Sequence, residues 1–388
     1  MMKPYAHPRN PKLPNIMLVI TEIAGAGAEL VVANLCKHLD RDKFNVTVCH
    51  LKSRGERGDE LNQLGYDIVG LPGTDPNKPN YGSALKLRRL VLSKRVDLLH
   101  SHNLQPLFDC GLCKLILPRV KLVHTFHYGN YPHLPLRYLV FEAFCARVAN
   151  RLVAVGYKQR MRICETYKFK PERIQTIYNG VEPIGALRTR EPGWRREPNR
   201  PLVVGSMCTF IEQKGLGYLL QVAAEMKRRG HDIQFVVAGE GPLRPQLEEQ
   251  KRDMGLDDTV EFLGWVPMAA SSILPQIDIF LQTSLWEAMS MVILEAMSAA
   301  KPIVATDVGE NRRIVVPAKA GFIVPPKDVS AIVDGLETLI ADRSLRLEIG
   351  QNARLSFLNK YTVELMARRH EKMYLDVLTG SSGPNRRA

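Results

Sequence analysis

Short apolar runs alternate with longer segments of helical period along most of the chain. In the first half the runs predict strands at 16–20, 45–51, 66–71, 97–100, 120–125 and 152–155, and the helical period predicts helices at 27–39 and 83–93. Strands that alternate with helices are typical of a parallel sheet wound with helices. The pattern therefore predicts an α/β domain over residues 1–183.

A second series of the same kind follows in the other half of the chain. Strands are predicted at 202–206, 234–238, 260–263, 277–281 and 302–306, with helices at 217–229, 243–254 and 329–342. Residues 184–200 have no apolar period and contain several Gly and Pro residues, which indicates a surface linker. We therefore expect a second α/β domain at 201–362, a further helix at 363–379 and a disordered tail at 380–388.

The net charge of +13 predicts an acidic partner. Phosphate-bearing substrates and an anionic membrane surface fit better than nucleic acid, because no basic-aromatic recognition motif is present. Residues 134–152 are either an interfacial helix or a core helix with a basic outer edge. The first apolar run, 16–20, is too short for a signal peptide or a spanning helix, so we expect a cytoplasmic protein, either free or peripheral on the inner face of the membrane.

The cysteines indicate reduced thiols rather than disulfides or a metal site. They are seven in number and scattered, and the pair Cys110 and Cys113 has no second pair to complete a zinc site. Asp40 and Asp42 have the spacing of a metal-binding DxD, but they follow a predicted helix and are better interpreted as a solvated turn. The sequence therefore predicts no metal.

Two carboxylates eight residues apart are the strongest chemical pattern. Glu287 and Glu295 flank the apolar run 291–294. If the interval is mostly helical, they lie roughly 12 Å apart along the axis and within about a fifth of a turn. Free backbone N–H groups at the helix start would attract an anion between them. This layout suits a diphosphate flanked by two sugars, although Glu287 alone is also typical of a helix cap.

The chain resembles the retaining family-4 glycosyltransferases of the GT-B fold along nearly its whole length. The similarity rests on the collinear segments Gly27-Ala-Glu29, His100-Ser-His102-Asn103, Thr125-Phe-His127, Tyr178-Asn-Gly-Val181, Lys214-Gly215, Gly239-Glu-Gly-Pro242, Phe262-Leu-Gly-Trp265, Glu287 to Glu295 and Pro302-Ile-Val-Ala-Thr306. It implies two Rossmann-like doubly wound domains facing across a cleft, with 363–379 crossing back to the first. It also implies transfer of a hexose-type sugar from a UDP- or GDP-sugar to a cell-surface polysaccharide or glycolipid precursor.

The resemblance also assigns roles to individual residues. It implies that Glu287, His127 and Lys214 are catalytic, that Glu295 binds the ribose, and that no metal or cofactor is needed besides the donor substrate. The other expected donor-binding residues are Ala288, Met289, Ser290, Thr209, Gly205, Gly239, Arg312 and Arg313. Gly25, Gly27 and His102 are expected to form the acceptor and phosphate loop of the first domain.

Three departures from the family pattern keep other functions open. Ala288 stands where the family usually has Gly, Thr209 where it commonly has Arg, and Arg313 where a Gly-Gly-x-x-Glu segment has Glu. A catalytically silent scaffold that binds nucleotide or glycan is therefore an alternative. A nucleotide-sugar epimerase of the same fold is a third, although it would lack the Glu287 and Glu295 pattern.

Overall fold

The computed structural model describes residues 9–25, 27–71, 82–131, 133, 135–184 and 201–380. The chain divides into two units. Unit 1 contains the residues up to Gly180 together with those from Val363 onward, and unit 2 is Val181–Thr362. The predicted linker therefore lies outside the described residues except for Ile184, and the predicted tail lies outside them except for Gly380.

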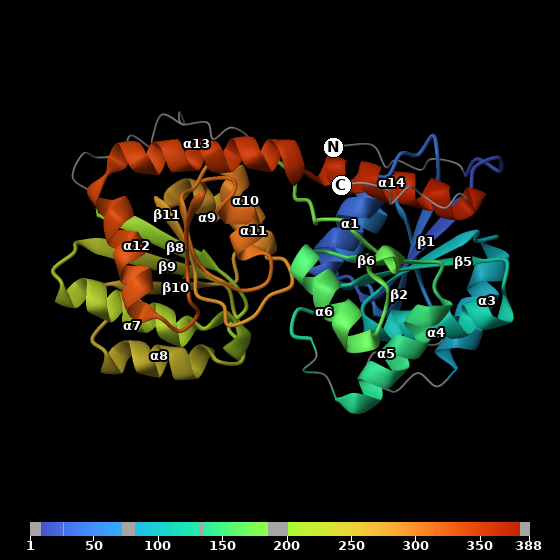
Figure 1. Cartoon of the computed structure of the whole chain (residues 1–388), viewed down its shortest axis with the longest axis horizontal. Coiled ribbons are helices and arrows are strands. Elements are labelled where there is room, and N and C mark those ends of the chain that lie inside the picture. The colour runs from blue at the N-terminus through green and yellow to red at the C-terminus, as the bar shows by residue number, and fades with distance from the viewer. Residues whose placement is uncertain are drawn as a thin grey trace. The chain divides into compact units, whose positions relative to one another are not determined.

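Unit 1 is built on a parallel sheet with the strand order β3-β2-β1-β4-β5-β6-β7 (Figure 1). Its strands are β1 Asn15–Glu22, β2 Asn45–Ser53, β3 Asp67–Gly70, β4 Leu98–His102, β5 Lys121–Phe126, β6 Arg151–Ala154 and β7 Ile174–Thr176. Its helices are α1 Ala28–His38, α2 Gly55–Gln63, α3 Ser83–Ser93, α4 Leu104–Ile116, α5 Leu136–Val148, α6 Tyr157–Tyr167 and α14 Val363–Thr379, with a 3-10 turn, η1, at Pro171–Arg173.

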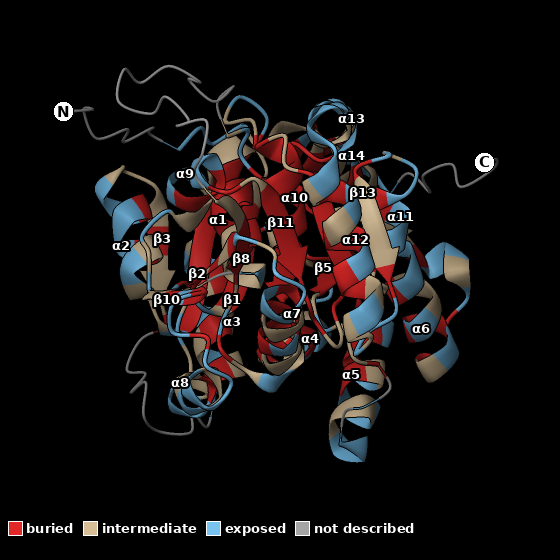
Figure 2. Ribbon diagram, turned by 90° about the vertical axis from the view of Figure 1, so that its left-hand side faces the viewer, coloured by how far each residue is buried: buried red, intermediate tan, exposed pale blue. Residues whose placement is uncertain are grey.

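The apolar runs form the strands because both faces of the sheet are covered. Residues 16–20 of β1 are fully buried, and β1 pairs in parallel with β2 on one side and β4 on the other. Continuous aliphatic strands are typical of parallel sheets covered on both sides, and the strands form the buried centre in Figure 2. The strand order reverses between β1 and β4, and the carboxyl ends of strands at such a reversal are the usual ligand-binding position in open α/β sheets.

Unit 2 repeats this plan with the strand order β10-β9-β8-β11-β12-β13. Its strands are β8 Leu202–Met207, β9 Ile233–Ala238, β10 Val260–Gly264, β11 Ile279–Gln282, β12 Ile303–Thr306 and β13 Gly321–Val324. Its helices are α7 Leu216–Arg228, α8 Arg244–Asp253, α9 Ala269–Ile273, α10 Met291–Ser298, α11 Asn311–Val315, α12 Val329–Ala341 and α13 Arg343–Lys360, with 3-10 turns η2 Glu212–Lys214 and η3 Leu274–Gln276. Here the order reverses between β8 and β11.

The helix at the carboxyl end of the chain packs within unit 1. α14 lies against α1 (Figure 1), and the Glu371 carboxylate accepts hydrogen bonds from the Asp40 backbone N–H at 2.9 Å and from Lys43 Nζ at 3.1 Å. Among the described residues, no helix is long and apolar enough to cross a membrane.

Candidate functional site

The Glu287 carboxylate lies in the loop between β11 and α10 and is paired with Lys214. Lys214 Nζ lies 2.6 Å from Glu287 Oε1, and the Ser284 hydroxyl donates to the same oxygen at 2.9 Å. The Glu287 side chain is only 8% exposed. Lys214 follows β8 and Glu287 follows β11, so the pair stands at the carboxyl ends of the two strands between which the strand order of unit 2 reverses. The structure thus brings together two of the three predicted catalytic residues.

Buried hydrogen bonds hold this loop in place. Gln282 Nε2 donates to Ser290 Oγ at 2.7 Å, and Asn311 Nδ2 donates to Gln282 Oε1 at 2.7 Å. Thr306 Oγ1 donates to the Ser284 carbonyl at 2.6 Å. Of these residues, sequence reasoning assigned a role only to Ser290, as a donor-binding residue. The sequence signal that could have identified them is the position of these polar residues at or directly after the carboxyl ends of apolar strands.

The predicted helical spacing of the two glutamates is wrong, because α10 begins only at Met291. Ser290 is the N-cap residue, and Glu287 lies in the preceding loop, so only the second half of the interval is helical. Glu295 is half-buried within α10. The free N–H groups of the helix therefore start at Met291 rather than at Ala288.

The methyl group of Ala288 is compatible with the loop. The φ angle of Ala288 is not positive, so its side chain adds no backbone strain. Gly309 makes the close approach instead, with φ of 51°. A Cβ at Gly309 would lie 2.6 Å from the Ala288 carbonyl oxygen and 2.7 Å from that of Glu287. The loop therefore depends on Gly309, and Met289 beside Ala288 is buried.

The remaining predicted donor residues lie within strands of unit 2 or in the segments that follow them. Thr209 is exposed after β8, Gly205 is buried within β8, and Gly239 directly follows β9. Both arginines already have acidic neighbours: Arg312 Nε lies 2.6 Å from Asp307 Oδ2, and Arg313 Nε lies 3.8 Å from Glu310 Oε2. A donor-binding role for these five positions stays a prediction.

A row of histidines lies at the carboxyl ends of β4 and β5 in unit 1. His102 Nδ1 lies 2.9 Å from His127 Nε2, and the two rings stack with centroids 5.2 Å apart. On the other side of His102 lies His100, with ring centroids 4.1 Å apart. His100 is itself held by the Tyr374 hydroxyl at 2.6 Å and the Thr125 hydroxyl at 2.7 Å. The structure therefore connects the predicted residues His102 and His127 directly.

Burial keeps these imidazoles neutral. Burial, followed by the charge of His370, lowers the pKa of His127 to about 3. Burial and then the neighbouring histidines hold the pKa of His102 well below its ordinary value. A neutral imidazole has one donor and one acceptor nitrogen, so the bond between His102 and His127 links their tautomers. The other ring nitrogen of His127 then takes whichever role, donor or acceptor, this shared bond leaves to it.

In the loop after β1, a backbone N–H group already donates to a carboxylate of the same segment. Gly27 has φ of 72° and precedes α1, and the Gly25 backbone N–H donates to the Glu29 carboxylate. Burial raises the pKa of that carboxyl. The predicted anion-binding amide of Gly25 is therefore occupied here, and Ala26 lies outside the described residues.

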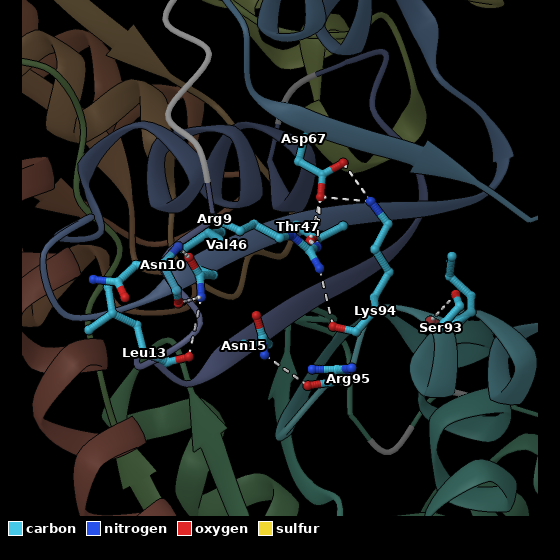
Figure 3. Close-up of polar contacts among 12 residues, drawn as sticks. Arg9, Asn10, Leu13, Asn15, Val46, Thr47, Asp67, Ser93, Lys94 and Arg95 are labelled. Atoms are coloured by element: carbon cyan, nitrogen blue, oxygen red, sulfur yellow. Dashed lines mark hydrogen bonds and ion pairs between the residues drawn. The ribbon is translucent and has the colours of Figure 1, made fainter.

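A cavity of about 620 Å³ lies at the opposite edge of the unit 1 sheet. It is lined by Arg9, Arg41, Asp67 and others at the amino ends of β2 and β3. Arg9 donates to Asp67 Oδ2 at 2.8 Å, and Lys94 lies 3.0 Å from the same carboxylate (Figure 3). Arg41 donates to the Cys36 and Val46 carbonyls. These polar contacts fasten the sheet edge, and the cavity contains none of the predicted site residues.

The cysteine and metal predictions concern other places in the fold. Cys110 and Cys113 are free thiols buried on α4. Asp40 stands in the turn after α1, where it pairs with Lys43 at 2.8 Å. Within the part of the chain that the structure describes, no group of three or more His, Cys, Asp or Glu side chains is arranged to hold a metal ion.

Comparisons with known families match both halves of the chain. Residues 25–183 match the family model described as Glycosyltransferase Family 4, and residues 189–356 match the one described as Glycosyl transferases group 1. The two matches together span both α/β units.

Individual relatives support the same family. The chain is 35% identical over 156 residues to an alpha-D-kanosaminyltransferase of Streptomyces kanamyceticus, a match that spans 40% of each chain. It is 25% identical to an Escherichia coli UDP-Gal:alpha-D-GlcNAc-diphosphoundecaprenol alpha-1,3-galactosyltransferase, over 76% of this chain and 79% of that one. Its fold is similar to that of Anabaena HepE in complex with UDP-glucose, with a TM-score of 0.79, 21% identity and coverage of 93% and 99%.

Proposed function

Because the chain belongs to the group 1, family 4 glycosyltransferases of the GT-B fold, we propose that it transfers a hexose-type sugar from a UDP- or GDP-sugar with retention of configuration. The acceptor we propose is a cell-surface polysaccharide or glycolipid precursor. The observation that carries this proposal is the ion pair of the buried Glu287 and the half-buried Lys214, 2.6 Å apart at the strand-order reversal of unit 2.

In this proposal, unit 2 binds the donor. Lys214 meets the diphosphate as a point charge, helped by the free N–H groups at the start of α10. Glu287 accepts hydrogen bonds from hydroxyls of the transferred sugar, and Glu295 accepts them from the ribose. Glu287 pairs with Lys214 in the structure, so donor binding exchanges this contact for contacts with the diphosphate and the sugar.

Unit 1 supplies His127 to the transferred sugar in this proposal. The neutral ring, held by His102, offers one nitrogen in a defined protonation state. The loop with Gly25 and Gly27 follows β1 and belongs to the acceptor or the leaving phosphate. Binding there requires the Glu29 carboxylate to release the Gly25 amide.

The proposed reaction takes place on one face of the sugar. The bond from the anomeric carbon to the diphosphate oxygen breaks, and the acceptor oxygen forms its bond on the same face. The acceptor proton passes to the leaving phosphate oxygen, so the protein needs to orient the reactants and to stabilise the developing diphosphate charge. Lys214 and the α10 amides supply that stabilisation without a metal.

We place this reaction in the cytoplasm, at the inner face of the membrane. All seven cysteines are free, and six of them are buried, as suits a reducing compartment. The charge of +13 favours substrates and surfaces that carry phosphate.

A screen of nucleotide-sugars tests the proposed activity. UDP- and GDP-sugars are compared by thermal stabilisation and by release of UDP or GDP, first alone and then with a broad acceptor set. We expect stabilisation together with nucleotide release from at least one donor. Stabilisation without release from any donor would instead favour the catalytically silent scaffold. The observation that supports this alternative is that Lys214 and the Gly25 amide already bind carboxylates of the protein itself.

A further inference from the structure

The buried side chain of Gln159 lies beside the backbone of His127. β5 ends at Phe126 and β6 at Ala154, and these two residues form the last pair between the strands. On its other side, β5 pairs with β4 only as far as Thr125. The sheet therefore no longer fixes the backbone at His127. Gln159 is the third residue of α6, the helix that follows β6, and is 5% exposed.

The Gln159 amide makes three hydrogen bonds to backbone groups at this point. Its Oε1 accepts from the Val155 N–H at 2.8 Å. Its Nε2 donates to the Phe126 carbonyl at 3.1 Å and to the Tyr128 carbonyl at 2.8 Å. Phe126 and Tyr128 are the residues before and after His127. One buried side chain thus holds the backbone on both sides of the histidine and ties it to the end of β6.

These contacts require an acceptor and two donated hydrogen bonds from one side chain. An amide supplies both, because its oxygen accepts and its NH2 group donates twice. An ionised glutamate has almost the same shape but no donor, so it would turn an oxygen toward the carbonyl oxygens of Phe126 and Tyr128. The substitution Gln159→Glu therefore removes both donated bonds while it keeps the volume of the side chain and the bond from Val155.

His127 is held from two directions by two different elements. Its ring is bonded through Nε2 to Nδ1 of His102 at the end of β4, and its backbone is held by Gln159 of α6. The direction of a side chain depends on the backbone that carries it, so a shift of this segment would also weaken the ring contact with His102. Supporting contacts of this kind keep a functional group within a fraction of an ångström of its working position.

We propose that Gln159 is a positioning residue for the transfer reaction. It holds the backbone at His127 so that the ring reaches the transferred sugar and keeps its bond to His102. The inference rests on the proposed role of His127. A displacement of about 1 Å can lower turnover by on the order of a hundredfold, so loss of these contacts should affect turnover more than donor binding. The alternative is that Gln159 only completes the hydrogen bonds of the strand ends and so stabilises the fold.

Asn45 provides a matched control, because its buried amide makes the same kinds of contact elsewhere in unit 1. Its Oδ1 accepts from the Asn10 N–H at 3.0 Å, and its Nδ2 donates to the carbonyls of Asn10 at 2.8 Å and Leu13 at 3.2 Å. Asn45 is the first residue of β2, whereas His127 follows the last residue of β5. In a parallel sheet these positions lie at opposite edges, so the control is remote from the proposed site.

Kinetics of the full chain test the effect on the reaction. Gln159→Leu and Asn45→Leu should both lower the unfolding temperature, because each leaves buried backbone groups unpaired. We expect Gln159→Leu to lower kcat by at least about tenfold with less than about a twofold change in donor KM, and Asn45→Leu to keep the wild-type kcat. Gln159→Glu serves if the leucine variant fails to fold. Its kcat relative to the wild type should rise as the pH falls, because protonation of the buried carboxyl restores one donor.

A measurement without substrates separates this inference from the proposed reaction. In protein labelled with 15N-histidine, the ring nitrogen shifts of His127 report its tautomer and its bond to His102, and His127→Gln identifies these signals. The shifts should change in Gln159→Leu and Gln159→Glu and stay as in the wild type in Asn45→Leu.

The inference is overturned if the Gln159 variants keep the wild-type shifts of His127, or if the variants of Gln159 and Asn45 lose kcat alike. Wild-type turnover in His127→Gln would instead refute the proposed role of that histidine, and the shifts would still decide whether Gln159 holds its ring.

Discussion

His102 and His127 share a hydrogen bond of 2.9 Å between Nδ1 and Nε2, with His102 buried at the end of β4 and His127 half-buried just after β5. Neither ring is protonated near neutral pH, since burial lowers the pKa of both. One ring must therefore donate to the other. We therefore predict that His102 acts as a positioning residue, because this bond couples its tautomer and orientation to those of His127.

Replacing His102 should impair turnover through His127. We expect His102→Leu to lower kcat by up to about tenfold, the equivalent of one net hydrogen bond, with little change in KM for the donor. The control is His124→Leu, which removes another buried imidazole that is bonded to Ser101 instead. Steady-state kinetics and thermal unfolding of both variants separate the effect on turnover from the effect on stability. Equal losses of kcat and of stability in the two variants would leave His102 with a packing role only.

The carboxyl group of Glu142 should make stability depend on pH. Burial raises its pKa to about 7, against the opposing hydrogen bonds from Tyr167 and Tyr131. The native state therefore holds a proton between about pH 4.5 and 7 that the unfolded state has released. The stability from this group is complete below about pH 4.5 and is lost as the pH rises through about 7.

The variant Glu142→Gln isolates this contribution. The free energy of unfolding of the wild type, relative to that of the variant, should fall with rising pH across this range, by up to about 3 kcal/mol. The buried histidines give the opposite slope, since their lowered pKa values make acid destabilising, but they are common to both proteins and cancel in the difference. Urea unfolding of both proteins at several pH values measures this difference in the free energy of unfolding. A difference that stays constant with pH contradicts the raised pKa.

We predict that transfer proceeds without a divalent metal. The physical reason is that Lys214 and the free N–H groups of α10 can stabilise the leaving diphosphate themselves. The measurement is release of UDP or GDP in the presence of EDTA, which should match release in magnesium. Complete loss of turnover in EDTA that magnesium restores would show a metal requirement.

Variants of the two arginines after β12 test whether these side chains replace the positive charge that Thr209 lacks. Under this hypothesis, Arg312 and Arg313 supply the cation that the family commonly has at position 209, at the cost of their contacts with Asp307 and Glu310. A charged donor in place of a neutral one contributes on the order of 1 to 2 kcal/mol. Arg312→Ala with Arg313→Ala should therefore slow turnover by roughly tenfold, and adding Thr209→Arg should restore part of it. Parental turnover in the double variant would exclude compensation.

Much of the fold was predictable because the strands are continuous aliphatic runs. The predicted strand 45–51 and helix 83–93 correspond closely to β2 and α3. β7 and β13 were not predicted, because three and four residues at a sheet edge carry too little period to distinguish a strand from a loop. The start of α10 was placed too early, because the sequence does not reveal that Gly309 packs against the backbone of the preceding loop.

The polar interior was harder to predict than the apolar core. Glu142 and Phe141 are adjacent, yet the glutamate is buried and the phenylalanine exposed. Only the tertiary contacts with Tyr131 and Tyr167 make this arrangement favourable, because a buried carboxyl group needs hydrogen-bond partners. The loop contacts of Ser284 and Gln282 likewise depend on residues far along the chain, which a local pattern does not record.

The different roles of Glu287 and Glu295 are the centre of the proposed mechanism. Isothermal titration with UDP and GDP, combined with turnover on the donor that the screen identifies, tests them most directly. We predict that Glu295→Ala weakens nucleotide binding by about tenfold or more, because it removes hydrogen bonds to a charged acceptor. Glu287→Ala should still bind the nucleotide but lose most of its turnover. Unchanged nucleotide affinity in the Glu295 variant, or wild-type turnover in the Glu287 variant, would contradict the account.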